Sequence, residues 1–167
     1  PNGQGKCTKS FVSGDSAGGG LSLGVTLSLK DDGSQLPDAV MSLCPWAELD
    51  PVSESYETNA SNDPYISRDA ISAFRDLYIE NESDLKDPYA SPVYGDYDGF
   101  PPLLIQVGGR EVLLDDSLKV AEKAKKSGCE VKLEVWDDMV HVFQGYAPFL
   151  PEANEALEAI AKFISNK

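Results

Sequence analysis

Residues 10–30 read SFVSGDSAGGGLSLGVTLSLK: a short apolar run, a serine flanked by glycines, and a segment that can form a helix. Gly14 to Gly18 (GDSAG) fits the pattern G-x-S-x-G, in which a sharp strand-to-helix turn lifts a serine hydroxyl above a parallel sheet. Glycine suits such a turn because a Cβ would crowd the backbone. The five-residue pattern alone fits a glycine-rich loop equally well, so the rest of the chain must decide whether Ser16 is a nucleophile.

The segment after the serine predicts a helix that begins near Ala17. Leu21, Val25 and Leu29 recur with helical spacing, and Gly33 is a suitable carboxyl-terminal cap. The first N–H groups of a helix have no intrahelical acceptor, so they can bind an oxyanion that forms beside the serine. The N–H of Ala17 is the candidate oxyanion donor.

Further along the chain, strand and helix signals alternate. Apolar runs at 38–44 and 102–107 predict strands buried on both faces, and the alternation at 130–136 predicts a strand at the sheet edge. Helices are expected after a cap at Asp115 or Asp116, and after Pro151, where Leu157, Ile160, Ala161 and Ile164 form an apolar stripe. This order predicts an α/β fold with a doubly wound, mostly parallel sheet that corresponds to half of a complete one.

One long segment interrupts this alternation. Residues 46–100 show no strand pattern, and within them Ser67 precedes an amphipathic helix that carries Ile71, Phe74, Leu77 and Tyr78. A long excursion between two strands is usually functional. The 167 residues therefore predict one domain with 46–100 as a cap insertion.

Composition excludes several classes of partner. A net charge of −14 repels nucleic acid and anionic membrane surfaces, and no run of 18 apolar residues is present. The three cysteines, Cys7, Cys44 and Cys129, are odd in number and widely spaced, which predicts free thiols and a cytoplasmic location. With one histidine and no Cys/His cluster, neither a metal nor a cofactor is expected.

A serine nucleophile needs a base and a group that orients the base. His141 is the single histidine and follows the last predicted strand, so it should lie at the same sheet edge as Ser16. The orienting acid should follow the third strand, where Glu111 and Asp115 are both available. Glu111 is favoured because it directly follows the strand and its glycine turn, whereas helix capping can account for Asp115 or Asp116.

Five ordered motifs extend these observations: GDSAGG (14–19), CPWAELD (44–50), ASPVYGDYDGFPPLLIQVG (90–108), EVLLDDS (111–117) and MVHVF (139–143). From Phe11 almost to the end, the chain resembles the hormone-sensitive-lipase-like carboxylesterases of the α/β-hydrolase fold. The resemblance implies that Ser16 is the nucleophile and His141 the general base. It also places Glu111 at the position of the catalytic carboxylate, which is Asp in the DPLxDE motif of many relatives.

The chain also departs from that family. The upstream HGGG loop, whose N–H groups complete the oxyanion hole, has no counterpart here. The strand at Phe11 and Val12 would then be an exposed apolar sheet edge. We therefore expect a companion, namely the amino-terminal half of the same hydrolase, and a homo-oligomer is also possible.

The main hypothesis is a serine carboxylesterase that hydrolyses short to medium acyl esters through a Ser-His-Glu triad. Asp15 and Trp46 are the candidate substrate-binding residues, and Tyr65 is a further candidate for the pocket, although the aromatic residues could equally just pack the cap. One alternative is a non-catalytic ligand-binding protein like the gibberellin receptors, which lack the catalytic histidine. Another is the hydrolase domain of a serine peptidase, which typically has an aromatic residue in the elbow, where this chain has Asp15 and Ala17.

Overall fold

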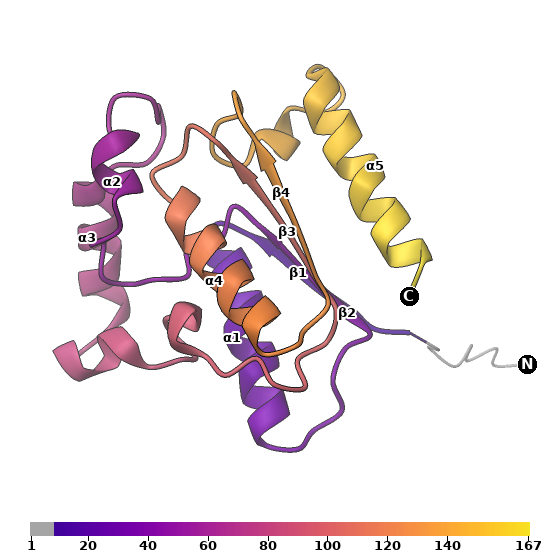
Figure 1. Ribbon diagram of the computed structural model, residues 1–167. Coiled ribbons are helices and arrows are strands. Elements are labelled where there is room, and N and C mark those ends of the chain that lie inside the picture. Colours follow the sequence, from indigo (N-terminus) through magenta and orange to yellow (C-terminus); the bar gives the residue numbers. More distant parts are fainter. Residues whose placement is uncertain (1–8) are drawn as a thin grey trace, which may run out of the picture.

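The computed structural model describes residues 9–167, and its centre is a parallel β-sheet (Figure 1). The four strands are β1 (Phe11–Asp15), β2 (Ala39–Leu43), β3 (Leu103–Gly108) and β4 (Val131–Trp136). They lie side by side in chain order, and every neighbouring pair is parallel. Since parallel neighbours need crossover connections, the chain returns across a face of the sheet after each strand.

Helices cover both faces of this sheet. Helices α1 (Ala17–Asp31) and α4 (Leu114–Lys126) pack on one face, and α5 (Pro151–Ser165) packs on the other (Figure 1). On the first face the core includes Leu23, Val40, Leu103 and Val120, among others; on the second it includes Ala39, Met41, Leu104 and Phe163. This arrangement confirms the predicted doubly wound α/β fold.

The strands follow the predicted patterns with one difference at β1. Strands β2 and β3 are almost entirely buried, and β4 lies at the predicted edge. The prediction placed the first strand at Phe11 and Val12 alone, but β1 continues to Asp15. Gly14 and Asp15 are poor strand formers, yet they pair in register with Ser42 and Leu43 of β2, and this ladder overrides local propensity.

Helix α1 buries a different face from the one its spacing predicts. Leu21 and Val25 are 61% and 42% exposed, whereas the buried side consists largely of glycines, Ser22 and Thr26 together with Leu23 and Leu27. Small residues are needed on that side because the backbone of other segments comes very close. A Cβ on Gly20 would lie 1.9 Å from the carbonyl oxygen of Trp46.

Residues 46–100 contain the short helix α2 (Ser55–Thr58), helix α3 (Arg68–Tyr78) and the 3-10 helices η1 (Glu82–Lys86) and η2 (Pro92–Tyr94), with no strand. Helices α2 and α3 lie beyond the carboxyl ends of β1 and β2 and beside α4 (Figure 1). The predicted cap of α3 is present, because Ser67 Oγ accepts the N–H of Ala70 at 3.2 Å. The division of the chain into a body and a cap stays a prediction.

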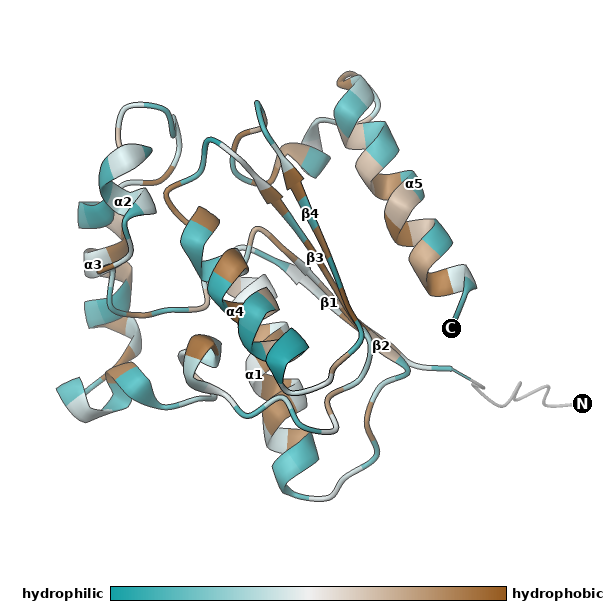
Figure 2. Ribbon diagram, in the orientation of Figure 1, coloured by the Kyte–Doolittle hydropathy of each residue, from teal (hydrophilic) through white to brown (hydrophobic). Residues whose placement is uncertain are grey.

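Two predicted helix details were wrong. Leu113 stands at the N-cap of α4, and the carboxylates of Asp115 and Asp116 bind segments outside that helix. On α5, which carries both hydrophobic and hydrophilic residues (Figure 2), Ile160 and Ile164 of the predicted stripe pack against the core, but Leu157 is 43% exposed and Ala161 is also exposed. Among residues 9–167, none of the helices is both long and apolar enough to cross a bilayer.

Candidate active site

Ser16 lies at the turn between β1 and α1. Its backbone has φ 55°, which is in the left-handed region, and its N–H donates to the carbonyl oxygen of Leu43 at 2.9 Å. A Cβ on Gly14 would lie 2.3 Å from the carbonyl oxygen of Gly18, so only glycine fits there. This is the sharp turn that the G-x-S-x-G pattern predicts, and it places the hydroxyl at the carboxyl edge of the sheet.

His141 follows β4, in the loop before the 3-10 helix η3 (Phe143–Tyr146), and it reaches Ser16 across the ends of the strands. Its Nε2 atom lies 2.9 Å from Ser16 Oγ. Its Nδ1 atom lies 2.6 Å from Oε2 of Glu111. The imidazole is 8% exposed, so both contacts are largely shielded from water.

Glu111 is fully buried, and both of its carboxylate oxygens have partners. While Oε2 contacts His141, Oε1 accepts the N–H of Gly108 at 2.6 Å. Asp115, the alternative acid, lies elsewhere: its carboxylate accepts the N–H of Ser55 at 2.8 Å. Of the two candidates, the structure therefore brings Glu111, and not Asp115, to the imidazole.

Of the other predicted site residues, Ala17 and Trp46 line the cavities beside Ser16, whereas Asp15 and Tyr65 do not. Ala17 is the first residue of α1, where the helix leaves its N–H groups without an intrahelical acceptor. Trp46 lines the cavities beside Ser16, whereas Asp15 is exposed and lines neither of them. Tyr65, the further candidate for the pocket, lines a separate hollow instead, and its hydroxyl contacts that of Tyr146.

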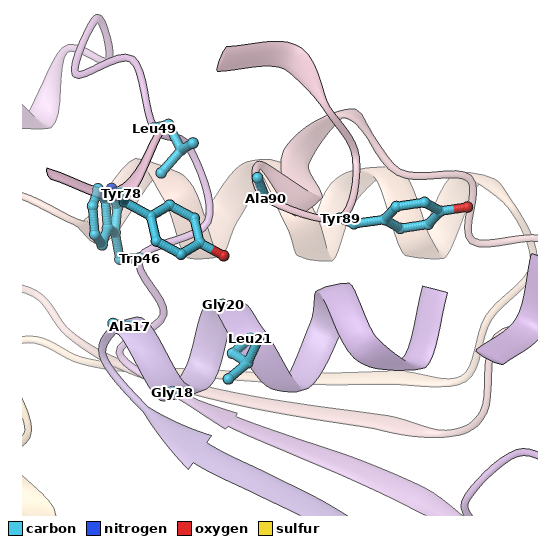
Figure 3. Close-up of a pocket in the computed structure, with 9 residues that line it drawn as sticks. All are labelled: Ala17, Gly18, Gly20, Leu21, Trp46, Leu49, Tyr78, Tyr89 and Ala90. Atoms are coloured by element: carbon cyan, nitrogen blue, oxygen red, sulfur yellow. The ribbon is translucent and has the colours of Figure 1, made fainter. Parts of the chain in front are cut away.

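Two apolar cavities border the first turn of α1 and share Ala17, Trp46 and Tyr78, and the larger one also touches Ser16. The larger has a volume of about 410 Å³ and is lined by Ser16, Ala17, Trp46, Ile66, Ile71, Phe74, Leu77 and Tyr78. The smaller has a volume of about 220 Å³ and lies between α1 and the segments that carry Trp46, Leu49 and Ala90 (Figure 3). Helix α3 thus supplies much of the larger wall, and its Leu77 is 86% exposed.

Cys44 belongs to the site, although no pattern in the sequence around it predicts a role there. It directly follows β2 with φ 47°, is fully buried, and its Sγ accepts the N–H of Val142 at 3.4 Å. Burial raises the pKa of this thiol well above its ordinary value, and the charge of Glu111 raises it further. The thiol therefore stays protonated beside the carboxylate.

Cys44, Glu111 and His141 place three potential metal-ligand atoms within 4.8 Å of one another. Both imidazole nitrogens already have hydrogen-bond partners, and the thiolate that a metal would need is disfavoured. These donors favour a hydrogen-bonded network over a cation site, and the expectation that no metal is needed stays a prediction.

A serine at a strand-to-helix turn, a carboxylate and a histidine, in this chain order at the carboxyl edge of a parallel sheet, is the arrangement of α/β-hydrolases. Residues 2–145 match the family model described as the alpha/beta hydrolase fold. The chain therefore belongs to the α/β-hydrolase family.

Similar proteins narrow this class. The chain is 38% identical over 153 residues to an acetyl-hydrolase of Streptomyces hygroscopicus, a match that covers 92% of the chain and 51% of the relative. It is 36% identical over 156 residues to an esterase of Acinetobacter venetianus, covering 93% of the chain and 52% of the relative. The chain thus spans about half the length of the curated relatives it matches.

Solved structures lead to the same group. An esterase from the bacterial hormone-sensitive lipase family superposes with a TM-score of 0.88 at 43% identity, covering 92% of this chain and 51% of that one. The esterase EstE5 superposes with a TM-score of 0.90 at 43% identity, covering 93% and 52%. These matches confirm the predicted resemblance to hormone-sensitive-lipase-like carboxylesterases.

Proposed function

We propose that this protein is a serine carboxylesterase in which Ser16 is the nucleophile, His141 the general base and Glu111 the orienting acid. The observation that carries the proposal is the position of the imidazole, which bridges Ser16 Oγ at 2.9 Å and the Glu111 carboxylate at 2.6 Å. Nδ1 faces the carboxylate, so Nε2 is the nitrogen available to accept a proton from the serine.

In the proposed reaction, Ser16 Oγ attacks the ester carbonyl carbon while its proton passes to His141 Nε2. The oxyanion of the tetrahedral intermediate accepts the N–H of Ala17. The alcohol then leaves with the proton from the imidazole, and an acyl-enzyme remains. Water attacks the acyl carbon, its proton passes through the same nitrogen back to Ser16 Oγ, and the carboxylic acid is released.

The cavities support apolar acyl esters of short to medium length as substrates. The larger cavity touches Ser16 itself, and apart from that hydroxyl its lining is apolar or aromatic, including Ile71 and Phe74. The similar esterase EstE5 has been soaked with p-nitrophenyl butyrate. A small acyl chain of that kind is therefore the first substrate to use.

The test compares the wild-type protein with Ser16→Ala on p-nitrophenyl butyrate and on a peptide substrate. The proposal predicts hydrolysis of the ester that the substitution removes, with little hydrolysis of the peptide. Preferential cleavage of peptides would support a peptidase, and tight binding of an ester without turnover would support a non-catalytic binding protein.

We further propose that a polypeptide outside residues 1–167, the amino-terminal half of the same hydrolase, covers β1 and the outer side of α1. In the described part of the chain, β1 pairs only with β2, so its second edge carries unpaired backbone groups. Leu21 and Val25 on α1, the helix that follows β1, are exposed. A second copy of the chain is the competing occupant, and a cytoplasmic location stays a prediction.

A further inference from the structure

Asp116 is a buried carboxylate that the proposed reaction does not use. Its side chain is fully buried at the start of α4, five residues beyond Glu111. Its Oδ2 atom accepts two backbone N–H groups, that of Ala47 at 2.8 Å and that of Glu48 at 2.9 Å. Asp116 therefore holds a segment that is 68 and 69 residues away in the sequence.

The segment that Asp116 holds begins with Trp46, which lines both cavities beside Ser16. The N–H of Trp46 donates to the carbonyl oxygen of Ser16 at 2.9 Å, and its indole Nε1–H donates to the carbonyl oxygen of Glu48 at 3.0 Å. The ring of Trp46 is thus held by Glu48, a residue whose own N–H donates to Asp116, while the Trp46 backbone is held directly against Ser16.

Other contacts from α4 hold the same segment farther along. Glu48 is buried, and its carboxylate accepts hydrogen bonds from Lys119, Ser53 and Tyr94. Lys119 lies one turn after Asp116 on α4, so the first turns of this helix carry two attachments to the segment. Glu111 lies just before the same helix. Helix α4 therefore helps to position both the segment that carries Trp46 and the proposed triad acid.

We propose that Asp116 is a positioning residue that fixes Trp46 against Ser16 and thereby sets which acyl chains the pocket accepts. The inference rests on the proposed esterase function and concerns the specificity of that site. Without the carboxylate, two buried N–H groups lose their acceptor, and the segment must shift to hydrate or re-pair them. Trp46 would move with it, because it is the adjacent residue.

The test is a double-mutant cycle on acyl selectivity, measured as the ratio of kcat/KM for p-nitrophenyl hexanoate to kcat/KM for p-nitrophenyl acetate. Each variant is made in the complete active protein. Trp46→Ala should change this ratio roughly tenfold, since a few methylene-sized contacts in an apolar pocket are worth that much. Asp116→Ala should change it in the same direction and by a similar factor.

The double variant shows whether Asp116 acts on acyl selectivity through Trp46. If Asp116 acts through Trp46, Asp116→Ala in the Trp46→Ala background should change the ratio by less than about twofold. An equal factor in both backgrounds would overturn the proposal, as would an unchanged ratio with only a lower unfolding midpoint. Glu122→Gln, an exposed carboxylate on the same helix, is the matched control and should leave the ratio unchanged.

Two further variants keep the test decisive if Asp116→Ala does not fold. Asp116→Glu retains the carboxylate but displaces it by one methylene, and its shift in selectivity should also vanish in the Trp46→Ala background. Asp116→Asn retains an acceptor oxygen and should preserve the wild-type ratio. A ratio like that of Asp116→Ala would contradict the proposal that this acceptor positions Trp46. If hydrolysis still depends on Ser16 but the hexanoate-to-acetate ratio does not change in the Asp116 variants, only this inference is refuted. If the wild-type protein shows no Ser16-dependent hydrolysis, both this inference and the proposed function are overturned.

Discussion

At the scale of single residues, backbone strain gathers around one imidazole. Within residues 9–167, the non-glycine residues with positive φ are Ser16, Cys44 and Val142. Such conformations are unfavourable for residues with a Cβ, and most of all for a β-branched valine. Ser16 contacts the imidazole, Val142 follows His141 in sequence, and Cys44 binds the Val142 N–H. The strain therefore coincides with the group that the proposed chemistry uses.

Glu111→Gln should reduce kcat for p-nitrophenyl butyrate by about 10⁴-fold, because an amide at this position no longer holds the imidazole in the tautomer that accepts the serine proton. Asp115→Asn is the matched comparison, since that carboxylate binds Ser55 and does not touch His141. It should keep most of the activity. Equal losses in the two variants would refute the assignment of Glu111 as the triad acid.

Gly14→Ala and Gly18→Ala form a second matched pair, measured by chemical denaturation. The new Cβ at Gly14 would meet the backbone of Gly18 at 2.3 Å, so we expect a loss of stability of about 1–3 kcal/mol or more. At Gly18 nothing lies within 4 Å, and alanine should stabilise the helix by up to about 1 kcal/mol. Tolerance of alanine at Gly14 would mean that the turn is not as tight as described.

At the scale of elements, periodicity and order predicted the four strands, their parallel arrangement and the loops that carry Ser16, Glu111 and His141. Patterns within a short window carry that information. They could not predict which side of α1 is buried, because close backbone approach at Gly20 reverses the usual preference for large apolar residues. The roles of Cys44 and Asp116 depend on contacts about 100 and 69 residues apart in the sequence, which no local pattern records.

The buried carboxyl group of Asp116, at the start of α4, should also make the stability of the protein depend on pH. Burial raises the pKa of Asp116 from its ordinary value of 3.8 to about 7, against the opposing effect of the N–H groups of Ala47 and Glu48. The charge of Glu48 raises this pKa further, and Lys119 lowers it. Because the folded pKa lies above the unfolded one, this group's contribution is fully present below pH 3.8 and is lost as the pH rises through about 7.

Asp116→Asn should remove that dependence. The free energy of unfolding of the wild type, minus that of the variant, should fall between about pH 4 and about pH 7 and then level off. Denaturant titrations of both proteins across this range give the difference directly. A difference that does not change with pH would show that Asp116 does not titrate in this range.

At the scale of the whole molecule, β1 and β4 are both edge strands in the described chain, and β1 is the edge that the proposed companion would cover. Residues 1–167 alone should hydrolyse p-nitrophenyl butyrate at least about 10²-fold more slowly than the protein with its proposed companion, because each missing oxyanion donor costs about 2.7–4 kcal/mol. Intact mass and kinetics of both preparations test this. A monomer of 167 residues with full activity would refute the proposal that a companion polypeptide is needed.

The proposed chemistry is tested most directly by covalent labelling of Ser16. We predict that a fluorophosphonate probe modifies the folded, complete protein once, at Ser16, and that His141→Ala slows this labelling strongly while the fold is retained. Peptide mass spectrometry locates the probe. Labelling at another residue, or an unmodified Ser16 in a folded and complete protein, would contradict the account.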